Sequence, residues 1–305
     1  MEKRIVQPIH ELIHWRNERY VQLGKEIEEK ERWEDEVELL CWLRARDSLL
    51  KRGAEVIRSY ATGDIIRKQQ IGRQELVDYV VKYEQFIKVK RNIYHTERIE
   101  ERRAFFEDGN LVKDVERKPK RLIKEEDGQS APLTLIDLGE NRNLKSSYNR
   151  LEAVKYAERW WDEYNPAYKK FTDNCTNFIS QCMRAGRAPM NGGGNRSKGW
   201  WFHKNNWSYS WTVAHSFRWY LSGAKAGLRG VERQSASDLA LGDVICYDFN
   251  GDGRWQHCTI VVAKDGNGEP LVNAQSANSR MRYWKYEDST AWTPNIKYKY
   301  FHIEV

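Results

Sequence analysis

The stretch Phe171-Thr-Asp-Asn-Cys-Thr-Asn-Phe-Ile-Ser-Gln-Cys182 carries the strongest structural signal in this sequence. Its apolar positions recur at helical spacing and predict a helix with one buried face. They are Phe178, Ile179 and Cys182, and Met183 directly after the stretch continues the pattern. Asp173 is placed to cap this helix and Gly186 to end it. Cys175 therefore falls in the first turn, where unpaired N–H groups and the positive end of the helix dipole favour a thiolate.

Cys175 is predicted to be a nucleophile because its neighbours are polar, which is unusual for a cysteine of a protein core. The remaining cysteines lie in apolar segments and are expected to pack the core. They are Cys41, Cys182, Cys246 and Cys258. The total of five is odd and no paired C-x-x-C spacing occurs, which indicates reduced thiols in a cytoplasm.

A cysteine nucleophile needs a base that removes its proton and later returns it, and imidazole does both near neutral pH. His257 is the best candidate, since it opens an apolar segment that reads as a strand and follows a glycine-containing loop. A third polar group should orient the imidazole. The next predicted strand offers Asn273 and Gln275 on one face, and we prefer Asn273 while Gln275 stays open.

The N-terminal part predicts helices followed by antiparallel strands. A helical apolar stripe runs from Ile9 to Ile27, and a leucine-rich helix follows. Over residues 77–84, apolar or aromatic residues largely alternate with charged ones, which predicts a strand. The segment 105–112 predicts a hairpin at Asp108-Gly109. We expect an accessory domain over 1–125, a linker over 126–146 and a second domain over 147–305.

The second domain also begins with helices. Asn149 as cap, with Glu152 three residues on, predicts the start of a helix that ends before Pro166. The helix that contains Cys175 follows, and three short strands are predicted over 243–248, 257–263 and 270–274. Helices first and a sheet afterwards indicate an α+β fold.

Several blocks of this second domain, in this order, resemble the bacterial "putative amidase" domain family, a relative of cell-wall cysteine amidases and endopeptidases. The blocks are 148–157, 171–182, 207–211, 241–248, 257–262 and 270–278. The resemblance covers about residues 147–305. It implies a papain-like cysteine hydrolase domain, with helices packed on a small antiparallel sheet, in which Cys175 is the nucleophile and His257 the base. It implies no cofactor and no metal.

Two positions depart from the family's pattern, which usually has an aspartate directly before the cysteine and a histidine near position 275. This chain has Asn174 and Gln275 there. Asp173 is a candidate to compensate for the first change. The alternative function is therefore a binding module on the same fold that grips a glycan or peptide but turns it over slowly or not at all.

Tryptophans concentrate in the second domain and offer broad apolar surfaces for a ligand. We expect Trp207, Trp211 and Trp255 to line a substrate groove, with a peptide or a peptidoglycan-like polymer as the substrate. The alternative is that these rings pack a small core.

A second chemical motif, His10-Glu11-Leu-Ile-His14, matches the H-E-x-x-H pattern of zinc peptidases. Only nine residues precede it, too few for the sheet that would form the other wall of a cleft. Both imidazoles also point away from the apolar stripe of their helix. Zinc chemistry at this motif is the lesser alternative.

The amino-acid composition gives only weak evidence about which classes of partner the protein binds. The net charge of +7 favours anionic partners, but acidic and basic residues are interspersed. The basic segment 117–124 lacks interleaved aromatics and a nucleic-acid fold signature, so no nucleic-acid partner is expected. No apolar run long enough for a membrane span and no signal peptide is visible, which predicts no membrane partner and a cytoplasmic location.

Overall fold

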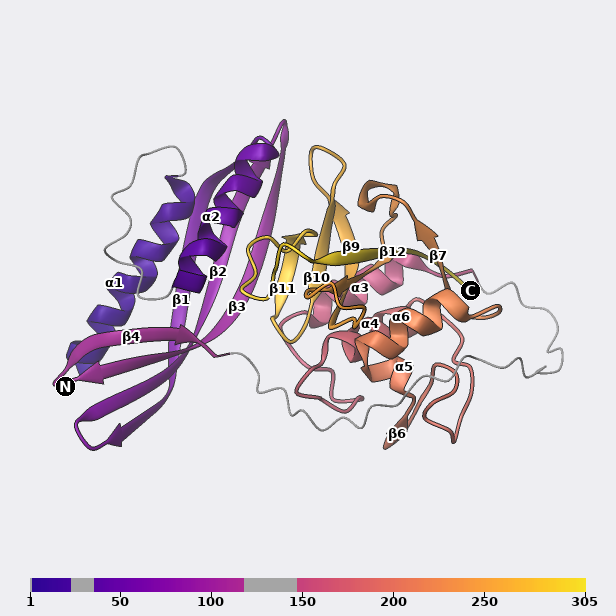
Figure 1. The fold of residues 1–305 in the computed structure, drawn as a ribbon, viewed down its shortest axis with the longest axis horizontal. Coiled ribbons are helices and arrows are strands. Elements are labelled where there is room, and N and C mark those ends of the chain that lie inside the picture. Colours follow the sequence, from indigo (N-terminus) through magenta and orange to yellow (C-terminus); the bar gives the residue numbers. More distant parts are fainter. Residues whose placement is uncertain (1, 23–35, 118–146) are drawn as a thin grey trace. The chain divides into compact units, whose positions relative to one another are not determined.

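We describe a computed structural model of the protein over residues 2–22, 36–117 and 147–305 (Figure 1). The chain forms two units. Unit 1 contains residues 1–118 together with 264–269 and 277–292, and unit 2 contains residues 119–263, 270–276 and 293–305. The predicted domain boundary is thus wrong in one respect, because two segments from the C-terminal half belong to the N-terminal unit. The predicted linker, 126–146, lies outside the described residues.

Unit 1 combines helices with an antiparallel sheet. Its elements are α1 (Glu2–Val21), α2 (Glu36–Lys51), β1 (Ala54–Ile71), β2 (Gln74–Val89), β3 (Asn92–Glu107), β4 (Asn110–Glu116) and β11 (Ser279–Tyr283). The strands follow the order β1-β2-β3-β11, and β4 also pairs with β3. The β11 pairing joins Ser279 to Arg98 and Arg280 to Glu97, and it is the reason that residues 277–292 belong to this unit.

The core of unit 1 lies between α1 and the sheet (Figure 1). Ile5 and Ile9 of α1 pack against alternate residues of β2 and β3, with Ile13 partly buried beside them. The buried strand residues are Val77, Tyr79, Val81, Tyr83, Ala104 and Phe106. The predicted apolar stripe, the alternating strand and the hairpin at Asp108-Gly109 are therefore confirmed within the described residues.

The long strand β1 was not predicted. Its register with β2 shifts between Val56 and Arg58 and again between Ile65 and Arg67. Each irregularity breaks the alternation of side chains by which a strand is recognised in a sequence.

Unit 2 places its first helices before its sheet. Its helices are α3 (Arg150–Trp160), α4 (Cys175–Ala185), α5 (Tyr209–Thr212), α6 (Ala214–Gly223) and the 3-10 turn η1 (Ala236–Asp238). Its strands are β5 (Phe202–His203), β6 (Asn206–Trp207), β7 (Arg229–Arg233), β8 (Val244–Asp248), β9 (His257–Lys264), β10 (Pro270–Ala274) and β12 (Lys297–Glu304). The strand order is β10-β9-β8-β12-β7, and β5 pairs with β6 separately.

Helix α4 forms the centre of unit 2, since every residue from Cys175 to Met183 is buried. The adjacent helix α3 begins as predicted, because the Asn149 side chain accepts a hydrogen bond from the Glu152 N–H at 3.1 Å. Gly186 ends α4, also as predicted. Among the described residues, no helix combines the length and the apolar content needed to cross a membrane.

Candidate active site

Helix α4 begins at Cys175, and its cap comes from a distant residue. Asn174 occupies the N-cap position, but its side chain makes no cap hydrogen bond, and the predicted cap Asp173 is exposed outside the helix. The Ser276 hydroxyl instead accepts from the Asn174 N–H at 2.7 Å and from the Cys175 N–H at 3.1 Å. Ser276 has φ 80°, a left-handed conformation that is uncommon for a residue other than glycine.

Asn174 and Gln275, the two departures from the family's pattern, hydrogen bond with each other. The Asn174 amide donates to the Gln275 carbonyl oxygen, while its own oxygen accepts from the Phe171 N–H at 2.9 Å. The Gln275 amide nitrogen donates to the Trp160 and Glu163 carbonyls. Both ends of the Gln275 amide are thereby engaged, and its contacts connect the end of α3 to the start of α4.

The Cys175 thiol is enclosed, with 4% of the residue's surface exposed. Burial raises its pKa to about 12, the nearby Cys258 and Asp173 act in the same direction, and hydrogen bonds from Thr176 and the Cys258 backbone oppose them. The expectation that the helix N-terminus would favour a thiolate is therefore not met, because burial outweighs the dipole. The thiol is protonated at neutral pH in this state.

The hydrogen bond to the sulfur brings the start of α4 to the start of β9. Cys258, whose backbone bonds to the Cys175 sulfur, directly follows His257. His257 is the first residue of β9, pairs in register with Tyr247 and is 7% exposed. Its ring lies 5.6 Å from that of Tyr247 and 6.1 Å from that of Phe249, measured between centroids. A helix and a strand far apart in sequence thus meet at Cys175 and Cys258, the residue after His257.

Asn273 is fully buried, and its amide reaches α3. Its amide nitrogen donates to the Glu158 carboxylate at 2.8 Å and to the Ala157 carbonyl at 3.4 Å. These contacts fix the amide against a helix, and they give Asn273 a packing role that the sequence did not suggest. Its role in orienting His257 stays a prediction.

The three tryptophans expected in a groove are all buried. Trp211 has no exposed surface, lies beside Trp200 with the two rings tilted and their centroids 4.7 Å apart, and donates from its indole to Asn177 at 2.9 Å. A side chain without exposed surface cannot stack on a ligand in this conformation, so Trp211 packs the core. Trp207 and Trp255 are 9% and 8% exposed, and Trp207 carries the Lys169 ammonium over its ring at 4.8 Å.

The H-E-x-x-H motif lies on α1 with its polar residues exposed. His14 forms an ion pair with Glu18 at 3.1 Å. A different group, Glu84, His95 and Glu97, has the mutual spacing of metal ligands among the described residues. Lys82 lies 2.5 Å and Arg280 2.7 Å from the Glu97 carboxylate, so protein cations already neutralise this group.

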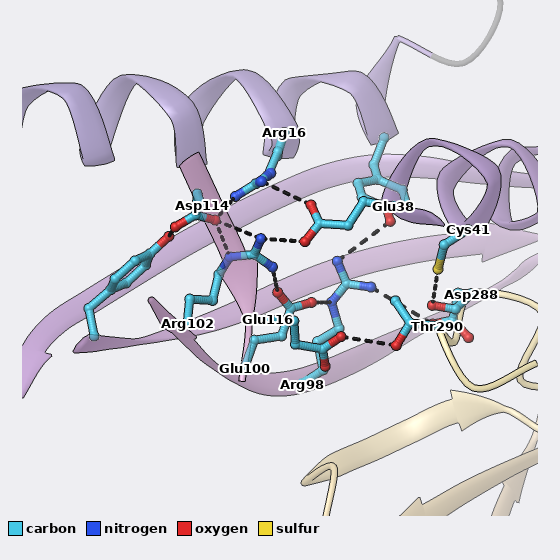
Figure 2. A network of polar contacts seen from close by, with 12 residues as sticks. Arg16, Glu38, Cys41, Arg98, Glu100, Arg102, Asp114, Glu116, Asp288 and Thr290 are labelled. Carbon is cyan, nitrogen blue, oxygen red and sulfur yellow. Dashed lines mark hydrogen bonds and ion pairs between the residues drawn. The ribbon is translucent and has the colours of Figure 1, made fainter. Parts of the chain in front are cut away.

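Unit 1 contains a buried cluster of opposite charges around a cavity of about 90 Å³ (Figure 2). Arg102 contacts Asp114 and Glu38, each at 2.6 Å, and Arg16 contacts the same two acids at 2.6 and 2.9 Å. Arg98 extends the cluster to Glu100 at 3.2 Å. Since the charges are paired with one another, the cluster fits a structural role.

The comparisons with known proteins agree with the sequence resemblance. Residues 147–301 match the family described as "Putative amidase domain", and the chain belongs to this family. It is 50% identical over 269 residues to the "Uncharacterized protein YhbB" of Bacillus subtilis (strain 168), covering 85% of each chain. It is 34% identical over 143 residues to "Uncharacterized protein YjcM" of the same organism, covering 43% of this chain and 31% of that protein. No solved structure matches. Family membership supports amide hydrolysis as the activity.

The sequence did not reveal two contributors to this site. Ser276, which caps α4, is separated from Cys175 by a hundred residues and belongs to no local capping pattern. Thr176, whose hydroxyl lies 3.7 Å from the Cys175 sulfur, is one of the polar neighbours of Cys175 in the sequence. The signal for Ser276 is tertiary, because it depends on which segments meet at the helix start, whereas Thr176 adjoins Cys175 and only its residue type could have indicated it.

Proposed function

We propose that unit 2 is a cysteine-dependent amidase of the papain-like class, with Cys175 as nucleophile and His257 as base. The observation that carries this proposal is the hydrogen bond between the Cys175 sulfur and the backbone of Cys258. That bond joins the helix start bearing the thiol to the strand start bearing the imidazole. Membership of an amidase family supplies the reaction class.

The mechanism starts from a neutral thiol, because burial raises the pKa of Cys175 to about 12. His257 removes the thiol proton as the sulfur attacks the amide carbonyl carbon, and it then delivers that proton to the departing amine. Water hydrolyses the resulting thioester and regenerates the thiol. The Cys175 N–H, which now bonds to the Ser276 hydroxyl, is the backbone donor that would hold the oxyanion.

The substrate we propose is a peptide amide, with peptidoglycan peptides as the first choice. The resemblance to cell-wall hydrolases motivates it, and the net charge of +7 is compatible with an anionic polymer. Two exposed cations, Lys169 and Lys170, lie a few residues before Cys175.

The contrasting proposal is a binding module that holds such a peptide without cleaving it. The enclosed, protonated Cys175 thiol favours this alternative, since a hydrolase has to expose that sulfur to its substrate.

Hydrolysis of soluble peptidoglycan fragments by the full chain tests the choice, with release of new amino groups as the measurement. We expect Cys175→Ala to abolish release and His257→Ala to reduce it about 10²- to 10⁴-fold. Cys182→Ala, at a buried thiol on the same helix, is the matched control and should retain activity. Release that survives Cys175→Ala would refute the cysteine mechanism. Fragment binding without any release by the unmodified chain would identify the binding module.

A further inference from the structure

We propose that Cys246 and Cys258 are an oxidation site, a thiol pair that a peroxide converts reversibly into an intramolecular disulfide. Their sulfurs lie 3.3 Å apart, and the two residues are register partners on β8 and β9. Both are free and have no exposed surface. Nothing in the amidase mechanism uses either side chain.

The backbone already has the geometry that a disulfide needs. The Val261 N–H donates to the Asp243 carbonyl at 2.8 Å, so residues 243 and 261 are a hydrogen-bonded pair of the β8–β9 ladder. Pairs alternate along an antiparallel ladder, which makes Cys246 and Cys258 a non-hydrogen-bonded pair with Cα atoms about 4.5 Å apart. Disulfides span Cα distances of about 4.4–6.8 Å, and their S–S bond is about 2.05 Å long. Closing the bond therefore requires a movement of the sulfurs by about 1.2 Å.

The chemistry balances with one peroxide for each disulfide. One sulfur loses its proton and attacks a peroxide oxygen, the O–O bond breaks, and a sulfenic acid and one water form. Burial raises the pKa of Cys258, so this step is slow at neutral pH and becomes faster as pH rises. The second sulfur then attacks the sulfenic acid sulfur, the S–O bond breaks, and the hydroxyl leaves as a second water. The two sulfurs are oxidised by two electrons and the peroxide oxygens are reduced by two. A dithiol reverses the reaction by exchange.

The consequence for Cys175 rests on the proposed function. The Cys258 backbone donates to the Cys175 sulfur, and the Thr176 side chain bonds to both Cys175 and Cys258. Closing the disulfide draws Cys258 toward β8 and weakens a bond that favours the Cys175 thiolate. We therefore expect slower alkylation of Cys175 and slower hydrolysis in the oxidised form, and recovery of both on reduction.

Peptide mapping of the full chain tests the oxidation site itself. The protein is treated with hydrogen peroxide, unfolded, alkylated with iodoacetamide and digested with trypsin. Cleavage after Arg233, Arg254 and Lys264 puts Cys246 in peptide 234–254 and Cys258 in peptide 255–264. We expect these two peptides to be joined, at a mass two hydrogens below their sum, and to separate after dithiothreitol. Alkyl groups on both cysteines after peroxide treatment, sulfinic acid at either, or a bridge from either to another cysteine would overturn the proposal.

Two variants serve as controls. Cys246→Ser should abolish the joined peptide, and Cys182→Ser should leave it unchanged. If Cys246→Ser does not fold, the map of the unmodified chain still decides the outcome. The map does not depend on hydrolysis, so a joined peptide in a chain that cleaves nothing would support the oxidation site and refute only the amidase. Hydrolysis by a chain that gives no joined peptide would support the amidase and refute the oxidation site.

Discussion

Ser276 is the residue on which the start of α4 depends, since its hydroxyl accepts from both the Asn174 and the Cys175 N–H groups. Removing an N-cap acceptor costs about 1 kcal/mol. We expect Ser276→Ala to lower the free energy of unfolding by that amount in urea titrations. Ser276→Gly is the matched variant, because it loses the same hydroxyl but relieves the left-handed backbone at φ 80°. An alanine variant at least as stable as the glycine variant would contradict this account.

A substitution at Asn273 can distinguish a packing role of this residue from a role in catalysis. Its buried amide nitrogen bonds to Glu158 and to the Ala157 carbonyl, and leaving such partners unsatisfied costs about 1–3 kcal/mol. We expect Asn273→Ala to destabilise the protein by that amount and, because the predicted orienting role toward His257 is lost with the amide, to lower the turnover of the folded fraction as well. Losing a residue that orients a catalytic histidine costs about 10⁴-fold in turnover. A fall of that size, measured as kcat per folded molecule, would support the orienting role, and an unchanged kcat would leave Asn273 with the packing role alone.

At the scale of elements, the charge cluster of Figure 2 joins α1, α2, β3 and β4 through Arg16, Glu38, Arg102 and Asp114. Burial alone would raise the pKa of Asp114, but Arg102 and Arg16 outweigh it and hold this pKa below the ordinary 3.8. Breaking a buried pair by neutralising one partner costs about 3–5 kcal/mol.

Asp114→Asn should therefore destabilise unit 1 by about 3 kcal/mol, because the buried Arg102 and the partly buried Arg16 lose this carboxylate. Asp47→Asn is the control, since Asp47 pairs with Lys51 at the surface and should change stability little. Equal unfolding free energies for the two variants, measured by urea denaturation, would show that the cluster adds no stability.

The sequence predicted those elements whose caps and turns are formed by residues close together in the chain, and it missed contacts between distant residues. The helix that starts after Asn149 and the hairpin at Asp108-Gly109 were predicted because their caps and turns are adjacent in the chain. Strand β1 was missed because bulges disrupt its alternation. Cys175 and His257 could be chosen by residue type and position. The Ser276 cap and the Asn174–Gln275 bond could not, since both need the tertiary fold.

For the whole molecule, buried thiols predict a loss of stability at high pH. Burial raises the pKa of Cys41 and of Cys175 to about 12, from an ordinary 9.0. A group whose pKa is raised on folding stabilises the native state fully below its unfolded pKa, and this contribution is lost as pH rises to the folded pKa. Each of these two thiols should cost about 1.4 kcal/mol at pH 10.

The urea midpoint should accordingly fall between pH 8 and pH 10 and continue to fall toward pH 12. Cys41→Ala is the informative variant, because it removes one titrating thiol from unit 1 and should flatten the slope. A midpoint independent of pH over this range would contradict the burial of these thiols.

Unit 1 contains segments from the C-terminal half of the chain, and this leads to a further prediction for the whole molecule. Residues 277–292 supply strand β11 and Asp288, whose carboxylate pairs with Arg282 at 2.8 Å and lies 3.8 Å from Arg98. A fragment of residues 1–146 lacks strand β11, Arg282 and Asp288, and it leaves the partly buried Arg98 without Asp288. We expect this fragment to show no cooperative thermal transition by circular dichroism, in contrast to the full chain. A sharp transition in the fragment would show that unit 1 is complete without the distant segment.

The path of the chain through unit 1 also bears on the order of events during synthesis. The ribosome releases residues in sequence, and the last segment of unit 1 ends at Trp292 of 305 residues. The sheet of the N-terminal unit therefore cannot be completed until strand β11 has been synthesised, and a nascent chain stalled before that point exposes the β3 edge that β11 later covers.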